Sequence, residues 1–159
     1  MFRLIFITVL FFTFSNGKII HFEEDKYIEV MDNSVYKKGT LEFVENKIIL
    51  KYDNSKRVLI YEDDSLRIKM GDEIQEIDLE NQIALKMVFL LIESIHKNDF
   101  LVLQEYFIIN KKNKVTSLVP KKALENYILS VEFKKTKILE YITIKMSNGN
   151  KTTIREIND

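Results

Sequence analysis

The stretch Gln82–Lys97, QIALKMVFLLIESIHK, is the only long segment with a helical period after residue 17 of this 159-residue chain. Its apolar side chains recur at spacings of three and four residues, which places them on one stripe of a helix: Ala84, Met87, Val88, Leu91, Ile92 and Ile95. Asn81 is the expected N-cap, and Asn98-Asp99 ends the helix. A large side chain contributes about 1.5–3 kcal/mol when it is fully buried, so we expect this stripe to be covered.

Most segments on either side of the helix alternate apolar and polar residues, which is the pattern of half-buried strands. The clearest example is the run of Leu66, Ile68 and Met70, with a charged residue between each pair. Gly39 is a candidate for a bend or bulge. Asn148-Gly149 predicts a type I′ hairpin turn, because both residues tolerate a positive φ.

The predicted fold class is mainly β (α+β). We expect about nine or ten strands, with signals that begin near Tyr27 and become clear at Thr40. The turns between them are so short that neighbouring strands must be antiparallel. The twist of so large a sheet makes it curl or close, and we expect the helix to fill the space that the sheet encloses. The architecture is therefore a curved antiparallel sheet, or incomplete β-barrel, with one central helix covering the concave face. Either a filled core or an apolar pocket can lie between the helix and the sheet.

Residues 1–17 have the layout of a secretory signal peptide. Arg3 gives a positive start, residues 4–14 are an apolar run interrupted only by threonines, and Ser15-Asn16-Gly17 supplies small residues for cleavage. The run is shorter than the roughly 20 residues that a helix needs to cross a bilayer. An uncleaved N-terminal anchor is the alternative. We expect a signal peptide at 1–17 and a single domain at 18–159.

The charge balance and the residue counts exclude several classes of function. Lys and Arg number 24, as do Asp and Glu, so no concentrated basic face for nucleic acid is expected. The chain has no cysteine, which excludes disulfides, thiolate metal sites and a lipid-attachment cysteine after the signal. The expected product is an exported protein, soluble in the periplasm and not anchored by lipid.

No pattern in the chain predicts an enzyme. His21 and His96 are far apart in the sequence, no serine lies in a nucleophile-elbow motif, and four glycines leave no phosphate-binding loop. The acidic runs 23–25 and 62–64 are typical of solvated turns rather than of a divalent-cation loop. We therefore expect no catalytic residues, no metal ligands and no cofactor.

Several short motifs follow one another along nearly the whole chain after residue 17. They are Phe22-Glu23-Glu24, Lys38-Gly39-Thr40-Leu41-Glu42-Phe43, Ile49-Leu50-Lys51-Tyr52, Arg57-Val58-Leu59-Ile60-Tyr61 before Asp63-Asp64, Glu105-Tyr106-Phe107, Leu118-Val119-Pro120-Lys121, and Asn148-Gly149-Asn150-Lys151-Thr152 with Ile154. In this order they resemble the outer-membrane lipoprotein carrier (LolA-like) superfamily, in its short, carrier-related branch. Each motif is weak alone, and the resemblance depends on their order.

The resemblance implies a half-barrel that carries acylated lipoprotein or lipid through the periplasm towards the outer membrane. It implies an inner-membrane donor and an outer-membrane acceptor as partners, and a monomer is expected. The acyl chains would lie between sheet and helix, in a cavity lined by Leu41, Phe43, Leu50, Tyr52, Ile68, Met70, Met87, Leu91 and Ile95. The alternative is a non-enzymatic envelope protein with a filled core that binds a partner by an exposed strand edge.

Two departures from the family pattern bear on the lid over such a cavity. Full carriers have a longer helical segment before the first strand, whereas about 20 residues separate the expected cleavage site from Gly39 here. The arginine-proline pair of the family is replaced by Val44-Glu45-Asn46-Lys47. In the carriers this arginine helps to hold the lid closed, so the resemblance predicts a smaller or more open pocket in this chain.

Overall fold

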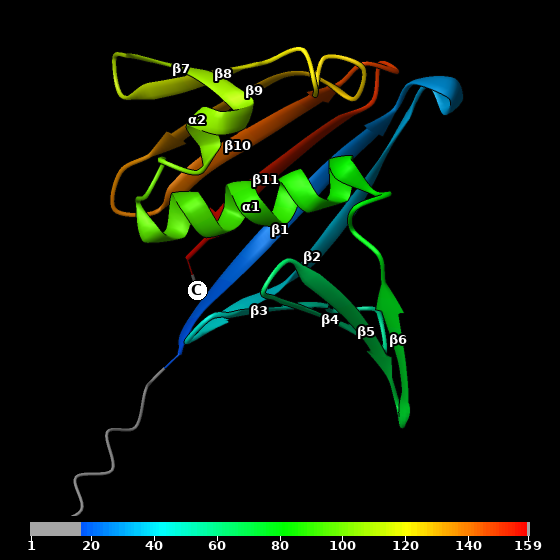
Figure 1. Ribbon diagram of the computed structural model, residues 1–159. Coiled ribbons are helices and arrows are strands. Elements are labelled where there is room, and N and C mark those ends of the chain that lie inside the picture. Colours follow the sequence, from blue (N-terminus) through cyan, green and yellow to red (C-terminus); the bar gives the residue numbers. More distant parts are fainter. Residues whose placement is uncertain (1–16, 159) are drawn as a thin grey trace, which may run out of the picture.

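The computed structural model describes residues 17–158, so the expected signal peptide lies outside the described residues except for Gly17 (Figure 1). The elements in chain order are β1 (Lys18–Ile28), η1 (Glu29–Met31), β2 (Asn33–Val44), β3 (Lys47–Tyr52), β4 (Arg57–Glu62), β5 (Ser65–Met70), β6 (Glu73–Ile77), α1 (Ile83–Lys97), α2 (Leu103–Tyr106), β7 (Phe107–Lys112), β8 (Val115–Pro120), β9 (Ile128–Lys135), β10 (Leu139–Met146) and β11 (Lys151–Ile157). The strands outnumber the expected nine or ten. β1 begins at Lys18, well before Tyr27. The sequence does not reveal this start, because Phe22 is the one buried side chain of the strand and lies among many charged residues that obscure the alternation.

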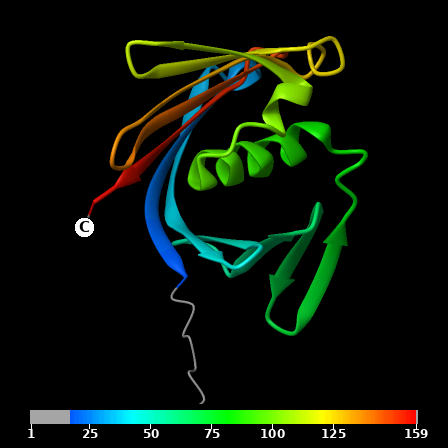
Figure 2. The same cartoon turned by 60° about the vertical axis from the view of Figure 1, so that its left-hand side comes forward.

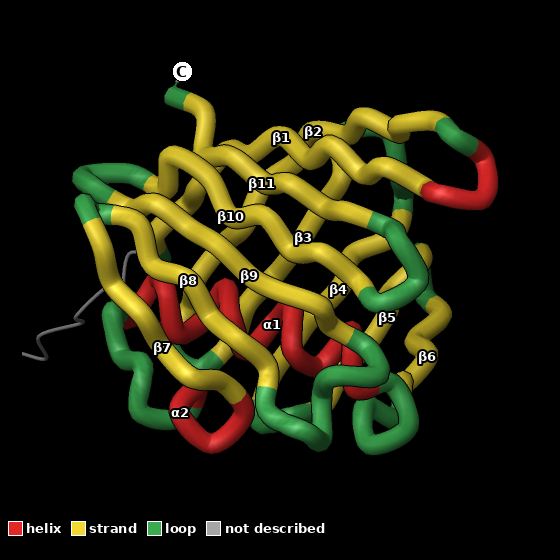
Figure 3. Tube along the Cα trace, turned by 90° about the horizontal axis from the view of Figure 1, so that it is seen from above, coloured by secondary structure: helices red, strands yellow, loops and turns green. Residues whose placement is uncertain are grey.

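All eleven strands form one open antiparallel sheet, in the order β6-β5-β4-β3-β2-β1-β11-β10-β9-β8-β7 (Figure 3). The predicted class, a curved antiparallel sheet with one main helix, is confirmed. β6 and β7 are the end strands, and the sheet does not close into a barrel. The central strand β1 separates two halves, which we call the β2–β6 arm and the β7–β11 arm.

Tight turns set the register of the hairpins. Asp63-Asp64 and Asn113-Lys114 both have positive φ at two successive residues, which is the geometry of a type I′ turn built without glycine. The hairpin expected at Asn148-Gly149 is present, but its type I′ assignment is wrong. Only Gly149 has a positive φ, 86°, and its N–H donates to the carbonyl of Met146.

Gly39 is required for close packing rather than for a bulge. The pairing of β2 with β1 and β3 runs through this residue without a register shift, so the expected bulge is absent. A Cβ built at Gly39 would lie 2.1 Å from the carbonyl oxygen of Lys51 and 3.0 Å from the ring of Phe22. Strands β2 and β3 can therefore approach this closely only because residue 39 has no side chain.

The helix α1 ends as expected, at Asn98 with φ 55°, but it begins differently. Its N-cap residue is Gln82, whose side chain makes no capping hydrogen bond. Asn81, the expected cap, donates instead from Nδ2 to Asp78 at 2.7 Å. The start of the helix is thus fixed by the preceding turn and by packing.

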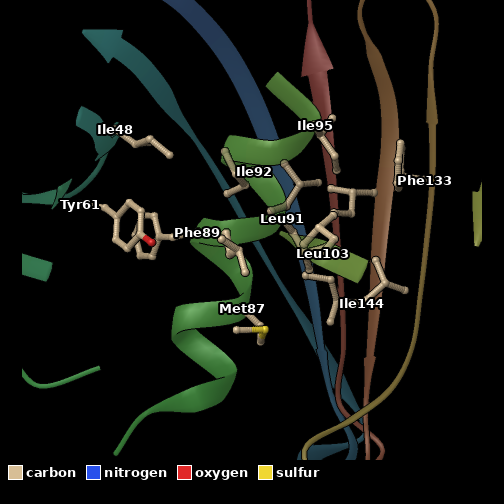
Figure 4. Close-up of a cluster of buried hydrophobic side chains, with 14 of the residues drawn as sticks. Ile48, Tyr61, Met87, Phe89, Leu91, Ile92, Ile95, Leu103, Phe133 and Ile144 are labelled. Atoms are coloured by element: carbon tan, nitrogen blue, oxygen red, sulfur yellow. The ribbon is translucent and has the colours of Figure 1, made fainter. Parts of the chain in front are cut away.

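The helix is buried on more than the predicted stripe, because the sheet curves around it (Figure 2). Phe89, Leu90 and Ser94 are buried in addition to stripe residues such as Leu91. Figure 4 shows Phe89 beside Tyr61 of the β2–β6 arm, with Leu91 and Ile95 on the side of the β7–β11 arm. The rings of Tyr61 and Phe89 are stacked, with centroids 4.9 Å apart. The helix is therefore the core element shared by both arms.

Candidate functional site

The register of the β2–β6 arm arranges its inward-facing side chains in rows across the strands. The first row is Phe43, Ile48, Tyr61 and Leu66, the second is Leu41, Leu50, Leu59 and Ile68, and the third includes Gly39, Tyr52, Arg57 and Met70. All three rows lie on the same face of the sheet because side chains alternate along a strand with a period of two. The rows differ in whether α1 covers them.

Burial decreases from the first row to the third along β5. Leu66 is fully buried, Ile68 is half-buried, and Met70 is 46% exposed. The helix crosses the first row, where Lys86 pairs with Asp64 at the β4–β5 turn at 3.4 Å. The outer part of this arm therefore has an apolar inner face that the helix does not reach.

A hollow occupies this uncovered part of the arm, and we call it the concave hollow. It has a volume of about 450 Å³ and is lined by Val35, Tyr36, Lys37, Lys38, Tyr52, Asn54, Ser55, Arg57, Leu59 and Ile68. It lies where β2 runs past the end of β3, since residues 33–38 pair with β1 and have no partner in β3. Its volume falls within the roughly 300–1,000 Å³ range of small-molecule sites.

An adjoining hollow of about 390 Å³ extends the same surface towards the end strand β6. It shares Arg57 and Ile68 with the concave hollow and adds Met70, Glu73, Ile74 and Gln75. The side chain of Ile74 is 65% exposed. Ile74 pairs with Lys69 and therefore lies on the opposite face of the sheet, so the inner face contributes Ile68 and Met70 to the apolar surface and Glu73 and Gln75 to its polar edge.

Tyr52 forms a fixed wall of the concave hollow. Its ring meets Phe22 edge-on, with centroids 5.8 Å apart, and its hydroxyl donates to Oε2 of Glu24 at 2.5 Å. Burial, together with this hydrogen bond to an acid, raises the pKa of Tyr52 well above its usual value. The phenol therefore stays neutral, and its ring carries the ammonium group of Lys37 at 4.9 Å.

A second, much smaller pocket lies at the C-terminal end of α1, and we call it the terminal pocket. About 40 Å³ of it is open to a water-sized molecule, which is room for a few waters and no more. Its apolar walls include Leu41, Phe43 and Ile95, and its charged residues include Lys18, Lys135 and Glu156. It is an order of magnitude smaller than a typical ligand site.

At the mouth of the terminal pocket, the C-terminal end of α1 contacts both arms of the sheet. The ring of His96 stacks on Phe43 of β2, with centroids 3.6 Å apart and planes 5° apart. Nζ of Lys135 on β9 donates to the carbonyl oxygen of Ile95 at 2.5 Å. Burial, reinforced by the charge of Lys18, lowers the pKa of His96 and also that of Lys135.

The structure distributes the nine predicted cavity residues over three places. Leu41, Phe43 and Ile95 line the terminal pocket, whereas Tyr52 and Ile68 line the concave hollow, and Met70 lines its extension together with Ile68. The remaining three, Leu50, Met87 and Leu91, are buried in the core and line none of these sites.

Sequence reasoning missed four residues of the concave hollow that matter below: Lys37, Lys38, Arg57 and Leu59. Residues 57–62 are apolar on both faces, a pattern typical of a strand that is covered on both sides. Only Tyr61 is buried in β4. The signal that could have been used is Arg57, the charged first residue of a largely apolar strand, because a charge there indicates an end that is exposed to solvent.

Comparisons with solved structures place the fold. A domain from Vibrio parahaemolyticus, provisionally named for outer-membrane lipoprotein sorting, aligns with a TM-score of 0.50 and 10% identity, over 91% of this chain and 84% of that one. A LolA superfamily protein from Nitrosomonas europaea aligns with a TM-score of 0.46 and 8% identity, over 91% and 85%. No family model and no curated protein matches the sequence.

The chain therefore has a LolA-like fold, in agreement with the resemblance of its motifs. At this level of identity the likeness concerns the fold alone. Among residues 17–158, no helix is long and apolar enough to span a membrane. The same residues contain no group of three or more acidic or histidine side chains arranged to hold a metal ion. The hollows are thus the structural features from which a function can be argued.

Proposed function

We propose that the protein is a non-enzymatic carrier, which shelters an acyl chain of a lipoprotein or lipid in the concave hollow during transport through the periplasm towards the outer membrane. The proposal includes export by residues 1–17 as a signal peptide, a single monomeric domain at 18–159, and donor and acceptor proteins at the two membranes. It involves no cofactor and no nucleic acid.

The observation that carries this proposal is an apolar inner face that no helix covers. Half-buried Leu59 and Ile68 continue the row of the buried Leu41 and Leu50, but beyond the reach of α1. An acyl chain laid on this row would gain about 0.8 kcal/mol for each methylene that it buries. Because the hollow is open to solvent, a bound chain could also leave it, as carriage requires.

The named sorting function of the Vibrio parahaemolyticus domain supports this interpretation by analogy of fold. The site differs from the one expected from the sequence. The space directly between helix and sheet is filled by side chains such as Met87 and Leu91, so we place the chain beside the helix rather than beneath it.

A charge placed on the floor of the hollow tests the proposal. Ile68→Glu should lower the uptake of a fluorescent monoacylglycerol by about tenfold or more, because the chain would have to desolvate a carboxylate. The fold should persist, since Ile68 is only half-buried. A ligand without charge isolates the contribution of the chain from that of any head group.

Lys69→Glu is the matched control, because this exposed neighbour on β5 points to the opposite face of the sheet. It should leave uptake unchanged. Circular dichroism should give the same spectrum for both variants and for the wild type. Unchanged uptake by a folded Ile68→Glu variant would exclude the hollow as the acyl-chain site.

The alternative, an interaction protein with a filled core, is favoured by the two ends of the sheet. The end strands β6 and β7 carry exposed Ile74 and Ile108, 65% and 55% accessible, beside an unpaired edge. Native mass spectrometry after gentle purification from the protein's own compartment separates the two functions. A stoichiometric acylated molecule supports the carrier, whereas a lipid-free protein complexed with another envelope protein supports the alternative.

A further inference from the structure

The charged residues that line the concave hollow all have the same sign. They are Lys37, Lys38 and Arg57, and the lining contains no acid. This imbalance is local, because the whole chain has equal numbers of basic and acidic residues, 24 of each. The hollow therefore combines an apolar floor with a cationic border.

These three cations form no ion pair with another residue of the described chain. The ion pairs of the β2–β6 arm lie elsewhere and use Lys47, Arg67 and Lys86. Lys37 is held over the ring of Tyr52, as described above. The side chain of Arg57 is exposed at the edge of the hollow.

Acids occur near the border but belong to adjoining surfaces. Glu23, Glu24, Asp25 and Asp53 line an adjoining polar hollow that also includes Lys37 and Lys38, and Glu73 lines the extension towards β6. Glu24 also accepts the hydroxyl hydrogen bond of Tyr52. They reduce the positive potential at the concave hollow without placing a carboxylate in its lining.

From this arrangement we propose that the ligand of the concave hollow is an amphiphile whose polar end is anionic, a phosphate or a carboxylate. This inference rests on the carrier function proposed above and specifies the chemical class of its cargo. The chain lies on Leu59 and Ile68, and the anion lies at the border. Arg57 is suited to this contact because its planar guanidinium can donate two parallel hydrogen bonds to a carboxylate or phosphate.

The border is solvent-exposed, so the contribution of each cation is modest and depends on salt. Exposed ion pairs are screened within about 8–10 Å at physiological ionic strength. We expect an anionic ligand to bind roughly five- to tenfold more tightly than a neutral ligand with the same chain at low salt. This preference should shrink as salt is added, whereas the affinity for the neutral ligand should not fall.

The experiment compares palmitoyl lysophosphatidate with monopalmitoylglycerol, both below their micellar concentrations, as competitors of the neutral fluorescent probe N-phenyl-1-naphthylamine. The variant Arg57→Gln/Lys37→Gln should remove the preference for the phosphate ligand and keep the affinity for the glycerol ligand. Lys69→Gln, on the opposite face of β5, should keep the preference. Inorganic phosphate alone should not displace the probe.

Each other outcome overturns a defined part of the argument. Equal affinity of the wild type for both acyl ligands, or a preference that persists in the double variant, would overturn the head-group inference and leave the carrier function standing. Displacement of the probe by inorganic phosphate alone would show a simple anion site rather than an amphiphile site. If neither acyl ligand displaced the probe, the carrier function and this inference would both fail.

Discussion

The two arms of the sheet have the same alternating strands but different degrees of cover. In the β7–β11 arm, α2 and the loop that follows β8 add Leu103 and Leu124, both fully buried, to the packing from α1. Strand β8 accordingly buries three of its residues, Thr116, Leu118 and Pro120. In the β2–β6 arm, β5 buries Leu66 alone. The difference lies in the helices and loops laid on the strands rather than in the strands themselves.

This comparison explains why a LolA-like fold can leave part of its concave face open. One helix of fifteen residues, α1, is too short to cover both arms along their whole length. Its two ends are fixed, by the pairing of Lys86 with Asp64 and by the stacking of His96 on Phe43. The uncovered rows then form the hollows.

The largest effect is expected where the two arms meet in the core. Leu91 is fully buried in the middle of α1, so Leu91→Glu would bury a carboxylate without a partner. The cost approaches the whole free energy of unfolding of a domain, on the order of 5–15 kcal/mol. We expect loss of the cooperative urea transition, and Leu91→Met is the control that should retain it. A folded Leu91→Glu variant would show that the space beside the helix is not filled.

A smaller effect should distinguish the two arms directly. Leu118→Ala, at a fully buried position of β8, should lower the free energy of unfolding by about 2–5 kcal/mol. Ile68→Ala, at the half-buried position of β5, should lower it by about 1 kcal/mol or less, since little contact is lost. Urea unfolding at constant pH measures both. Equal losses would mean that the outer part of the β2–β6 arm is covered in solution.

The sequence predicted the fold class because its signals are local and periodic. Alternation around Leu66 and the helical period up to Ile95 identify strand and helix without tertiary information. Strand β1 was missed in part because its only buried side chain is Phe22, between charged neighbours. The turn at Asn148-Gly149 was assigned to the wrong type because the dipeptide also suits a turn with one positive φ, at the glycine.

The candidate site was less predictable, because alternation shows which face a side chain takes and not what covers it. Leu50 and Ile68 both lie in the same row of the same face, but α1 and its neighbours cover only the first. The cationic border depends on β2 running past the end of β3, which is a property of the register. No sequence period encodes that overlap.

The smallest effect concerns the helix end, where His96 stacks on Phe43 of the β2–β6 arm and Lys135 of the β7–β11 arm donates to the carbonyl of Ile95. Burial and the nearby charges of Lys18 and Lys135 lower the pKa of His96 in the folded protein, relative to the ordinary value of about 6.5 in the unfolded chain. Between those two pKa values the unfolded state binds more protons. The His96 contribution to stability should therefore fall as the pH decreases through about 6.5.

His96→Gln should remove this component, so the difference in unfolding free energy between wild type and variant should decrease from about pH 7.5 to pH 5. His21→Gln, on the exposed face of β1, is the matched control and should leave the component in place. Subtracting the unfolding free energy of one variant from that of the other cancels the contribution of the carboxylates that titrate in the same pH range. A difference that stays constant with pH would mean that the stack on Phe43 is open in solution, and that the helix end does not hold the two arms together.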